Sequence, residues 1–430
     1  MATPSGAGRR DYPLPGLCLD PSAVRAKGGV FGNFVNTPRE EIRRALLQTG
    51  FVEVRFAAAD AVREPHRERF LQWLADGKHA EMGWMERTAA KRLDPSEVLE
   101  GALSLILLGV NYLPADGKAR GQETWAKYAL YSDYHDTIKA GLVRAGGVLE
   151  EKLGLGPSDY RYYVDTGPVL ERGWAARSGM GWQGKNGMLI SRRHGNWLFL
   201  AAILTRYPFE PDPPLSVGRT DPPGEDGSAA GFPAVGALCG TCRRCIDACP
   251  TDAIKSGGLV DARLCVSYQT IENKGMIPRD LRPGLGGRIF GCDICLDVCP
   301  WNKFARTASS LLLAARHDLA GLSVADVLHL SREEFSRVFA KTPVKRLKWR
   351  GLLRNACVAA GNARELGWSG EEIAGLRERL LELAACDEPV VRAHAVWAVR
   401  RLWPDRAGEW LGPLRERETD PEAAAEFDGL

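Results

Sequence analysis

The spacing of hydrophobic residues in the first half of the chain changes repeatedly between helical and strand-like periods. Apolar residues recur at helical spacing after Thr37-Pro38, where threonine is a good N-cap and proline suits the first helical turn. The patterns predict helices from Pro38 to Gly50 and over 66–77 and 133–153, strands over 51–57, 103–113 and 160–165, and a hairpin over 186–205. Because helices and strands alternate, we expect one α/β or α+β domain around a single sheet.

The second half of the chain is organised differently. Residues 206–236 are dense in proline and glycine, which favours a flexible connection. After residue 320 the pattern is purely helical, and Asp387–Leu402 resembles the second helix of a HEAT-type repeat, with Gly351–Ala363 as an earlier partner. The expected boundaries are a flexible extension at 1–35, the α/β domain at 36–210, a linker at 211–236, a cysteine-rich domain at 237–305, the helical region at 320–412 and a flexible tail at 413–430.

Charge and composition exclude several classes of protein. The 430 residues carry a formal net charge of only +3, so any nucleic-acid surface has to come from local basic patches. The chain has no apolar run of about eighteen residues that would predict a membrane span. Arg9-Arg10 is not followed by the apolar run of a twin-arginine export signal. We therefore expect a cytoplasmic protein without a membrane partner.

Eight of the eleven cysteines fall between Cys239 and Cys299. The first run, CGTCRRCIDACP, has the spacing in which three thiolates hold one [4Fe–4S] cluster and the fourth holds a second cluster. The later run, CDICLDVCP, lacks its first cysteine because that position is Ile289, and Cys265 is the obvious replacement. The expected ligand sets are Cys239, Cys242, Cys245 and Cys299 for one cluster and Cys249, Cys265, Cys292 and Cys295 for the other.

Zinc and disulfides account for these cysteines less well than iron–sulfur clusters do. Zinc sites also use CxxC pairs, but usually as two separate pairs and without the CxxxCP ending. Disulfides would need an oxidising compartment, and nothing in the sequence points to one. The cysteines therefore indicate a protein that transfers electrons one at a time.

A second group of candidate residues lies between residues 162 and 190. Asp165 ends a predicted strand, where reactive groups gather in α/β domains, although an aspartate before a turn is also a common cap. A glycine-rich loop follows and holds Trp182, Gln183, Lys185 and Asn186. Its spacing is not GxGxxG, and the chain has no GxxxxGKS/T run, so the common dinucleotide and phosphate-loop motifs are absent.

Two basic stretches are candidate surfaces for nucleic acid. Residues 341–355 hold six Lys and Arg and no acid, and Trp349 lies among them. Cations beside an aromatic ring suit a phosphate backbone with exposed bases, and a solvated helix face with counter-charges elsewhere is the alternative. Residues 83–95 hold Arg87, Lys91 and Arg92 on an expected turn, where a surface loop is the simpler interpretation.

Taken together, these motifs resemble those of epoxyqueuosine reductases, the cobalamin-dependent iron–sulfur enzymes of tRNA queuosine synthesis. The resemblance runs from about residue 40 to 405 and rests, in the family's order, on MGWMERTAAKRLDP, DYHD, VDTGPVLERGWAARSGMGWQGKNGMLI, NWLFLAAILT, the eight cysteines, CVSYQTIENKG, GCDICLDVCPWN and LLRNACVAAGN. It implies the fold class α+β, with a nitroreductase-like α/β cobalamin-binding domain, a ferredoxin-like domain with two [4Fe–4S] clusters, and C-terminal α-helical HEAT-like repeats. The DxHxxG run of many cobalamin proteins is absent, and the family does not depend on it.

The resemblance also implies roles for individual residues. The corrinoid would be lined by Arg92, Ala126, Asp165, Gln183, Lys185, Asn186, Leu189, Leu200, Ile203 and Ser267. The tRNA would be bound by Arg172, Lys274, Lys345, Arg346, Arg350 and Arg354. Asp165 falls on the family's proton donor, and donating a proton at pH 7 would require a pKa raised by burial. The cluster of Cys265 would lie nearer the cobalt, so that electrons would run toward it from the cluster of Cys239.

The reaction expected from the resemblance is the two-electron reduction of epoxyqueuosine to queuosine at the wobble position of tRNA. The expected cofactors are cobalamin (vitamin B12), resting as cob(II)alamin, and two [4Fe–4S] clusters. The expected partners are tRNAs with GUN anticodons (Asp, Asn, His and Tyr type) and an external one-electron donor such as flavodoxin or ferredoxin, with the protein itself a monomer. The alternatives are a corrinoid iron–sulfur reductive dehalogenase, a non-catalytic electron carrier and an RNA-binding repeat protein.

Overall fold

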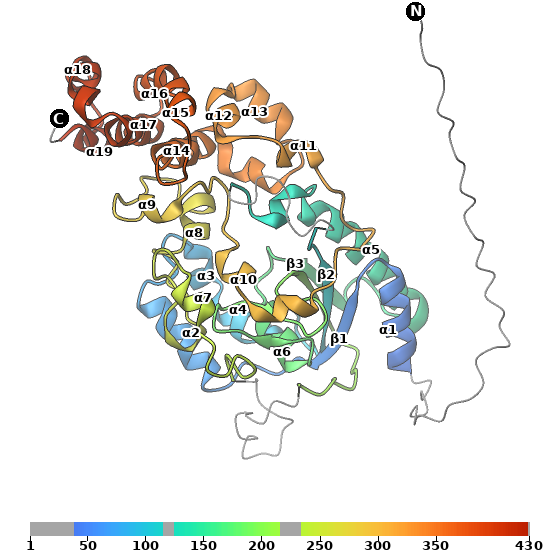
Figure 1. Ribbon diagram of the computed structural model, residues 1–430. Helices are drawn as coiled ribbons and strands as arrows, with labels where there is room; N and C mark the ends of the chain where they lie inside the picture. Colours follow the sequence, from blue (N-terminus) through green and yellow to red (C-terminus); the bar gives the residue numbers. More distant parts are fainter. Residues whose placement is uncertain (1–37, 115–123, 216–233, 429–430) are drawn as a thin grey trace, which may run out of the picture. The chain divides into compact units, whose positions relative to one another are not determined.

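A four-stranded antiparallel sheet of order β1-β2-β6-β3 forms the centre of the first half of the chain (Figure 1). The computed structural model describes residues 38–114, 124–215 and 234–428, so the expected extension at 1–35 and most of the expected linker lie outside the described residues. The strands are β1 Glu53–Ala58, β2 Ser104–Asn111, β3 Tyr160–Val164 and β6 Leu198–Thr205. The α+β alternative of the sequence prediction is therefore confirmed, because every neighbouring pair of strands is antiparallel.

Alternate residues of β2 and β6 face two different cores. Ile106 pairs with Ile203, and both belong to the core cluster shared with the helices of one face. Leu107 pairs with Ala202, and both belong to the core cluster on the opposite face. All eight residues of β2 are buried, as expected for a strand that is covered on both faces.

Helices cover both faces of the sheet. Helix α1 (Pro38–Gln48) and helix α5 (Tyr134–Leu153) contribute to the core cluster of Ile106, and helix α6 (Glu171–Arg177) contributes to that of Leu107. The sequence prediction for α5 is confirmed at both ends. The Asp133 side chain accepts a hydrogen bond from the His135 N–H as the N-cap, and Gly154 takes the left-handed conformation as the C-cap.

The remaining elements before the cysteines are short. Helices α2 (His66–Ala75), α3 (Gly83–Arg87) and α4 (Ala89–Leu93) follow β1, so Arg87, Lys91 and Arg92 lie on helices and not on the expected turn. Strands β4 (Trp182–Gln183) and β5 (Leu189–Ile190) pair with each other. A single bridge between Ser191 and Gly195 closes the expected turn, but the hairpin predicted over 186–205 is wrong, because β5 pairs with β4 and β6 lies in the four-stranded sheet.

The cysteine-rich segment contains only short helices. They are α7 Arg244–Asp247, α8 Val266–Ile271, α9 Arg282–Leu285 and α10 Ile294–Asp297. Cys265 is the residue before α8, and Cys299 is the residue before the 3-10 helix Pro300–Phe304. Ile289, which stands where the second run lacks a cysteine, is fully buried in the core of the C-terminal helices.

Helices alone make up the C-terminal part. They are α11 His317–Ala320, α12 Val324–His329, α13 Arg332–Val338, α14 Lys348–Gly361, α15 Gly370–Gly375, α16 Arg377–Ala384, α17 Pro389–Leu402, α18 Pro404–Arg415 and α19 Pro421–Ala424. Their core includes Trp125, Ile271 and Phe290, so the helices pack on the body of the protein. The flexible tail expected at 413–430 is wrong for its described part, because Phe427 is 0% exposed and Glu426 pairs with Arg282 at 2.7 Å.

Residues 306–316 connect the cysteine-rich segment to these helices and run over the sheet domain. The backbone carbonyls of Arg306 and Thr307 accept hydrogen bonds from the Asn111 side chain. Leu312 is buried in the core beneath α5, at a place where Gly141 has no side chain to block it. The described residues contain no helix long and apolar enough to cross a membrane.

Candidate functional site

The eight cysteines between Cys239 and Cys299 form two groups in space. Burial raises the pKa of Cys245, and the nearby thiols of Cys239, Cys299 and Cys242 raise it further. In the second group, burial raises the pKa of Cys295 far above its ordinary value, and the thiols of Cys292 and Cys265 contribute to that rise. The pKa of Cys265 is raised by burial and then by Cys249. These neighbours are compatible with the two expected ligand sets, although Cys245 of the first set also contributes to the rise at Cys295, and the assignment of each cysteine to a cluster stays a prediction.

The surroundings of the thiols suit iron–sulfur clusters. The Ala253 N–H donates to Cys249 Sγ at 3.3 Å, and the Thr251 hydroxyl lies 3.8 Å from the same sulfur. Such N–H donors to cysteine sulfur stabilise the negative charge of a cluster. Across the described ranges, no three His, Cys, Asp or Glu side chains converge as they would around a single metal ion.

The glycine-rich loop between β4 and β5 connects the sheet domain to both cysteine groups. Lys185 Nζ donates to the carbonyls of Gly240 at 2.7 Å and Cys242 at 3.0 Å, and the Asn186 amide lies 3.4 Å from the Cys295 carbonyl. The corrinoid contacts expected of Lys185 and Asn186 stay predictions beside these hydrogen bonds. Both side chains are occupied in holding the cysteine-rich segment.

Asp165 lies at the end of β3 against the first turn of α5. The Tyr134 hydroxyl donates to Asp165 Oδ2 at 2.6 Å, and His135 Nε2 lies 3.4 Å from the same oxygen. The other ring nitrogen of His135 lies 2.7 Å from Asp133 Oδ1, so the imidazole is held between two carboxylates. The φ angle of Asp165 is +59°, a left-handed conformation that turns the chain sharply after the strand.

The protonation states around Asp165 differ from the sequence prediction. Burial raises the pKa of Asp165, but hydrogen bonds from His135 and Tyr134 outweigh it and leave the pKa below its ordinary value. The expectation of a raised Asp165 pKa is therefore wrong. Burial lowers the pKa of His135, but its bonds to Asp133 and Asp165 raise it to about 9. At pH 7 the proton of this group resides on His135.

Glu171 is a second protonated group near Asp165. Burial raises the pKa of Glu171 to about 8, and the charge of Asp165 contributes to the rise. Its Oε1 atom is buried without a hydrogen-bond partner among the described residues. Arg92 lies near both Glu171 and Asp165. Burial lowers the pKa of the Arg92 guanidinium, and the charges of these two carboxyl groups oppose that shift. The sequence analysis assigned no role to Glu171.

The Asp165 side chain is partly open to solvent. It is 56% exposed, yet burial is the largest influence on its pKa, because other protein atoms surround the carboxylate on its remaining sides. We call this partly open surrounding the recess of Asp165. Tyr134 stacks on Phe199 with ring centroids 4.4 Å apart, and the Tyr128 ring meets Tyr134 edge-on at 6.0 Å. These aromatic rings form an apolar wall beside the carboxylate.

The remaining corrinoid contacts expected from the sequence are distributed over both faces of the sheet. Leu189 and Leu200 belong to the core cluster of the α6 face. Ile203 lies on the opposite face and is fully buried there, in the same core cluster as Tyr134 beside Asp165, and its corrinoid contact stays a prediction. Ala126 is buried, while Gln183 and Ser267 are partly exposed.

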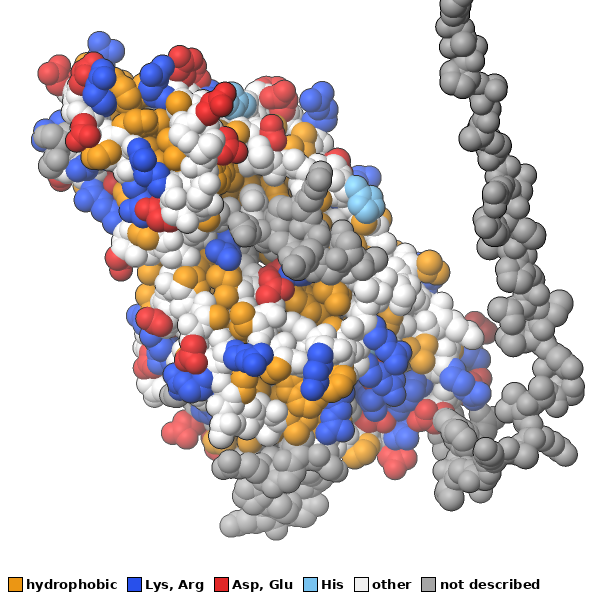
Figure 2. Space-filling view, in the orientation of Figure 1, with side chains coloured by type: hydrophobic (Ala, Val, Ile, Leu, Met, Phe, Trp, Pro, Cys, Tyr) orange, Lys and Arg blue, Asp and Glu red, His pale blue; other side chains and the backbone are white. Residues whose placement is uncertain are grey.

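A basic loop borders the recess of Asp165. The Asp133 N–H donates to the Lys341 carbonyl at 2.8 Å, which places the loop before α14 against the first turn of α5. Arg346 pairs with Glu272 at 2.7 Å, and its charge contributes to lowering the pKa of Asp165. Lys345, Arg346 and Arg350 are exposed here, as are Lys274 and, elsewhere, Arg172. Figure 2 shows that Lys and Arg gather in local groups on this face.

Two expected nucleic-acid contacts in this segment are corrected. Arg354 is 0% exposed, and its guanidinium donates to the carbonyls of Gln269, Asn273 and Gly275. It is therefore a structural residue that joins α14 to the cysteine-rich segment. Trp349 is half-buried, and its indole N–H donates to the Leu330 carbonyl at 2.7 Å.

Two sequence-family models match parts of the chain. The model described as epoxyqueuosine reductase QueG, DUF1730 matches residues 92–166, which reach from Arg92 to the turn after Asp165. The model of the 4Fe-4S double cluster binding domain matches residues 238–302, which hold all eight clustered cysteines.

Curated relatives and solved structures match most of the chain. The epoxyqueuosine reductase of Pseudomonas aeruginosa is 34% identical over 360 residues, covering 82% of this chain and 91% of the relative. The epoxyqueuosine reductase of Vibrio cholerae is 34% identical over 366 residues, covering 84% of this chain and 90% of the relative. A structure of epoxyqueuosine reductase with a tRNA-Tyr epoxyqueuosine-modified stem loop aligns with a TM-score of 0.76 and 27% identity, covering 90% of this chain and 96% of that chain. A structure of epoxyqueuosine reductase from Streptococcus thermophilus aligns with a TM-score of 0.71 and 25% identity, covering 91% of this chain and 97% of that chain.

Proposed function

Because the chain belongs to the epoxyqueuosine reductase family, we propose that it reduces epoxyqueuosine in tRNA to queuosine. The single observation that carries this function is the agreement of sequence and structure over nearly the whole chain with relatives of that name. Family membership also decides against the reductive dehalogenase, the simple electron carrier and the RNA-binding repeat protein as alternatives.

The reaction removes the epoxide oxygen as water and leaves a carbon–carbon double bond. It consumes two electrons and two protons for each epoxide. The chain must therefore supply a path for single electrons, a proton near the departing oxygen and a surface that holds the RNA. The two cysteine groups, the recess of Asp165 and the basic loop before α14 meet these three needs.

The donor sets fit the proposed cofactors. Two groups of four thiols with N–H donors suit two [4Fe–4S] clusters. Cobalamin, which when bound supplies a strongly reducing cobalt centre, fits the recess through its amide side chains. Glu171 Oε1 is buried there without a partner among the described residues, and the Arg92 guanidinium lies beside it. We assign cobalamin contacts to Arg92, Ala126, Asp165, Gln183, Lys185, Asn186, Leu189, Leu200, Ile203 and Ser267, and Lys185 and Asn186 also fix the loop.

Protonation of the departing oxygen is assigned to Asp165 acting with His135. His135 holds the proton at pH 7, and its Nε2 atom lies 3.4 Å from the carboxylate that faces the recess. Tyr134 fixes the orientation of that carboxylate through its 2.6 Å hydrogen bond. A proton passed from His135 to Asp165 becomes available at the substrate side, and the charged pair is restored from solvent.

The RNA surface is assigned to exposed cations, most of them in and near the basic loop beside the recess. They are Lys274, Lys345, Arg346 and Arg350, together with Arg172 outside the loop, and they suit phosphate groups of the anticodon stem loop. A wobble base must leave the loop stack to reach Asp165, and a recess flanked by aromatic rings suits an extruded base. The proposed substrates are tRNAs with GUN anticodons, of the Asp, Asn, His and Tyr type.

The domain assignments follow from the same family. We propose that the sheet domain is nitroreductase-like and binds cobalamin, that residues 237–305 are ferredoxin-like, and that the C-terminal helices are HEAT-like repeats that contact tRNA. A monomer acting in the cytoplasm, reduced by an external one-electron donor such as flavodoxin or ferredoxin, completes the proposal.

The test is analysis of tRNA nucleosides. A strain that lacks this chain should accumulate epoxyqueuosine and contain no queuosine, and expression of the chain should restore queuosine. The purified protein with both clusters and cobalamin should convert epoxyqueuosine in a tRNA-Tyr stem loop when given a chemical reductant. Unchanged queuosine in the deletion strain would refute the proposed function.

A further inference from the structure

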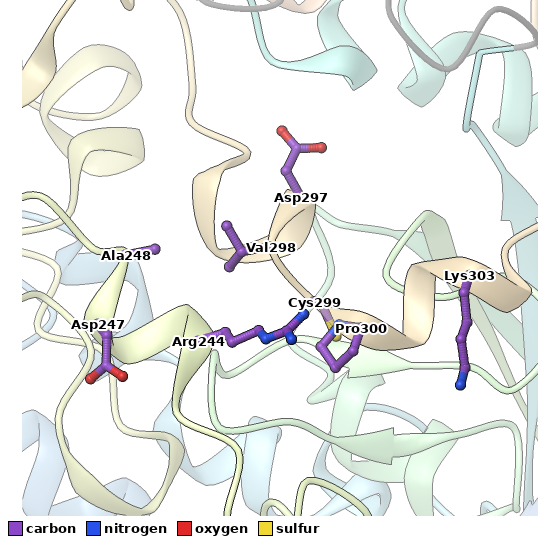
Figure 3. Close-up of a pocket in the computed structure, with 8 residues that line it drawn as sticks. All are labelled: Arg244, Asp247, Ala248, Asp297, Val298, Cys299, Pro300 and Lys303. Carbon is purple, nitrogen blue, oxygen red and sulfur yellow. The ribbon is translucent and has the colours of Figure 1, made fainter.

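An open hollow with a volume of about 870 Å³ lies beside Cys299 (Figure 3). It is lined by Arg244, Asp247, Ala248, Asp297, Val298, Cys299, Pro300 and Lys303. The Arg244 side chain extends toward Cys299 and Pro300, so a cation lies at the cysteine that completes the first ligand set. None of these lining residues belongs to the group of side chains around Asp165.

The unpaired charges of the hollow are positive. Asp247 is neutralised by Arg243 at 3.3 Å, and Asp297 by Lys127 at 2.6 Å. Arg244 and Lys303 are exposed and form no ion pair with any described residue. A negatively charged partner would therefore find free cations here, and no carboxylate without a counter-charge.

The positive surface continues from the hollow to the hairpin turn. Gly195 is so close to Asn302 and Ala305 that a Cβ atom there would lie 2.7 Å from Asn302 Oδ1. Burial lowers the pKa of His194, the nearby Glu53 carboxylate opposes this, and the charges of Arg306 and Arg193 lower it further, so both arginines lie near this turn. Arg193 lies 3.8 Å from Glu53, and its side chain is 65% exposed. Arg192, on the same turn, is exposed and has no ion pair in the described ranges.

An apolar ring lies at the centre of these cations. Phe304 is 49% exposed, Lys303 Nζ lies 4.7 Å from its ring centre, and its ring centre is 5.6 Å from that of Trp301. Trp301 in turn packs on Trp182 at 4.7 Å. We call Arg192, Arg193, Arg244, Lys303, Phe304 and Arg306 the Phe304 patch. Figure 2 shows Lys and Arg side chains around a hydrophobic area on the lower part of this face.

We propose that the Phe304 patch is the docking surface of a small acidic one-electron carrier protein. An apolar centre with a charged rim is the usual anatomy of a transient protein interface, and complementary charge speeds the encounter. The inference rests on the proposed function, because that reaction consumes electrons which the chain cannot generate. The patch adjoins Cys299, so a docked carrier would lie next to the first cluster.

Each docking event transfers one electron. The carrier is oxidised by one electron, and the cluster held by Cys239, Cys242, Cys245 and Cys299 is reduced by one. Two such events and two protons balance the conversion of one epoxide to one alkene and one water. The tRNA surface at Lys274 and Arg346 lies on other elements, so RNA and carrier can be bound together.

The experiment measures binding without turnover. Holoenzyme with both clusters and cobalamin is titrated with oxidised flavodoxin, a small acidic flavin protein, by calorimetry at low and moderate salt. Lys303→Glu/Arg306→Glu should raise the Kd about tenfold or more at low salt, and the difference should shrink as salt screens the charges. Arg415→Glu/Arg417→Glu changes the net charge equally at the end of α18, which Figure 1 shows far from α7 and α10, and should leave the Kd unchanged.

Two further outcomes decide the assignment. The neutral variant Lys303→Gln/Arg306→Gln should give an intermediate Kd with unchanged iron content, which guards against a folding defect in the reversed variant. Equal Kd values for wild type and both patch variants would overturn the proposal. So would a loss of affinity for a tRNA stem loop with flavodoxin binding intact, because the patch would then belong to RNA.

Turnover separates this inference from the proposed function. With titanium(III) citrate as reductant, the patch variants should reduce epoxyqueuosine tRNA at the wild-type rate, and with reduced flavodoxin they should be slower. If wild type fails with both reductants, the proposed function is wrong, whereas the binding measurement still judges the docking surface.

Discussion

At pH 7 the three titratable groups nearest the end of β3 carry different charges. The lowered pKa of Asp165 keeps it ionised, the pKa of about 9 keeps His135 protonated, and the pKa of about 8 keeps Glu171 mostly neutral. Two transferable protons therefore surround one carboxylate. This separation of protonation states by environment is the usual sign of acid–base chemistry.

Asp165→Asn tests the carboxylate that faces the recess. The amide preserves the shape of the side chain but removes the charge that holds the His135 proton. We expect unchanged iron and cobalamin content and a turnover of epoxyqueuosine tRNA that is lower by about 100-fold or more, measured by nucleoside mass spectrometry. Asp136→Asn, on the exposed side of the same helical turn, is the matched control and should turn over normally. Retained deoxygenation in Asp165→Asn would reject the assigned role.

The pH dependence of turnover tests His135. The protonated imidazole is the required form, so the rate should fall as pH rises through about 9, and His135→Gln should be slow at every pH and lack this limb. Glu171→Gln should instead abolish any decline of the turnover rate near pH 8. A wild-type rate that is flat from about pH 7 to 10 would contradict this pH dependence.

His135 also links the stability of the folded protein to pH. Because the pKa of His135 in the folded protein exceeds 6.5, its contribution to the free energy of unfolding is complete below pH 6.5 and is lost as pH rises through about 9.

Sequence reasoning found Asp165 but not its partners. Asp165 could be singled out because it follows a predicted strand, whereas Tyr134 and His135 lie on a helix that meets it only in the folded chain. The DYHD run contained the signal, but the sequence could not show that its histidine bridges two carboxylates. The sign of the Asp165 pKa shift depends on those hydrogen bonds, so the sequence prediction of that sign was wrong.

At the scale of elements, α14 has two roles on successive turns. Arg350 and Arg354 are four residues apart, yet Arg350 is exposed and Arg354 is fully buried. Residues four apart lie on the same face of a helix, so helical periodicity predicts the same exposure for Arg350 and Arg354. The difference arises because residues 269–275 cover only the second of the two turns. Exposure here depends on a segment that packs from elsewhere in the chain.

The pair Arg350→Ala and Arg354→Ala separates these roles. Arg354→Ala leaves the carbonyls of Gln269, Asn273 and Gly275 without their donor and should lower the free energy of unfolding by about 3 kcal/mol or more. Arg350→Ala should change it by less than about 0.5 kcal/mol and should weaken binding of a tRNA stem loop. Thermal denaturation and a binding titration measure the two effects. Equal destabilisation by both variants would contradict the structural role of Arg354.

Regular elements were predicted best where their own sequence determines them. Helix α5 begins at its aspartate cap and ends at its left-handed glycine, and β2 is the continuous apolar run of a strand covered on both sides. The prediction of a flexible C-terminal tail was wrong because Phe427 and Glu426 find their partners only after folding. Pairing of the cysteines into two sets was predictable, since the spacing of a double-cluster motif is set by the geometry of the clusters.

At the scale of the whole molecule, the cysteine-rich segment joins the sheet domain to the C-terminal helices. Lys185 and Asn186 bind its carbonyls from one side. Arg354, Asn355 and Asn362 bind carbonyls of Gln269, Thr270 and Arg282, among others, from the other side. The segment has only short helices and a small core cluster around Val266, Ile277 and Leu285, so bound clusters would add to what holds it in shape.

Removal of iron should therefore loosen the molecule unevenly. Without clusters, the carbonyls that accept from Arg354 and Asn355 lose their fixed positions, so amide exchange should increase in residues 239–299 and in α14. The central strands β2 and β6 are held by their own ladder and two apolar cores, and should keep their protection. Hydrogen–deuterium exchange of the holo and chelator-treated protein measures this difference. If α14 exchanged as slowly without iron as with it, the cysteine-rich segment would not be the element that couples the two halves.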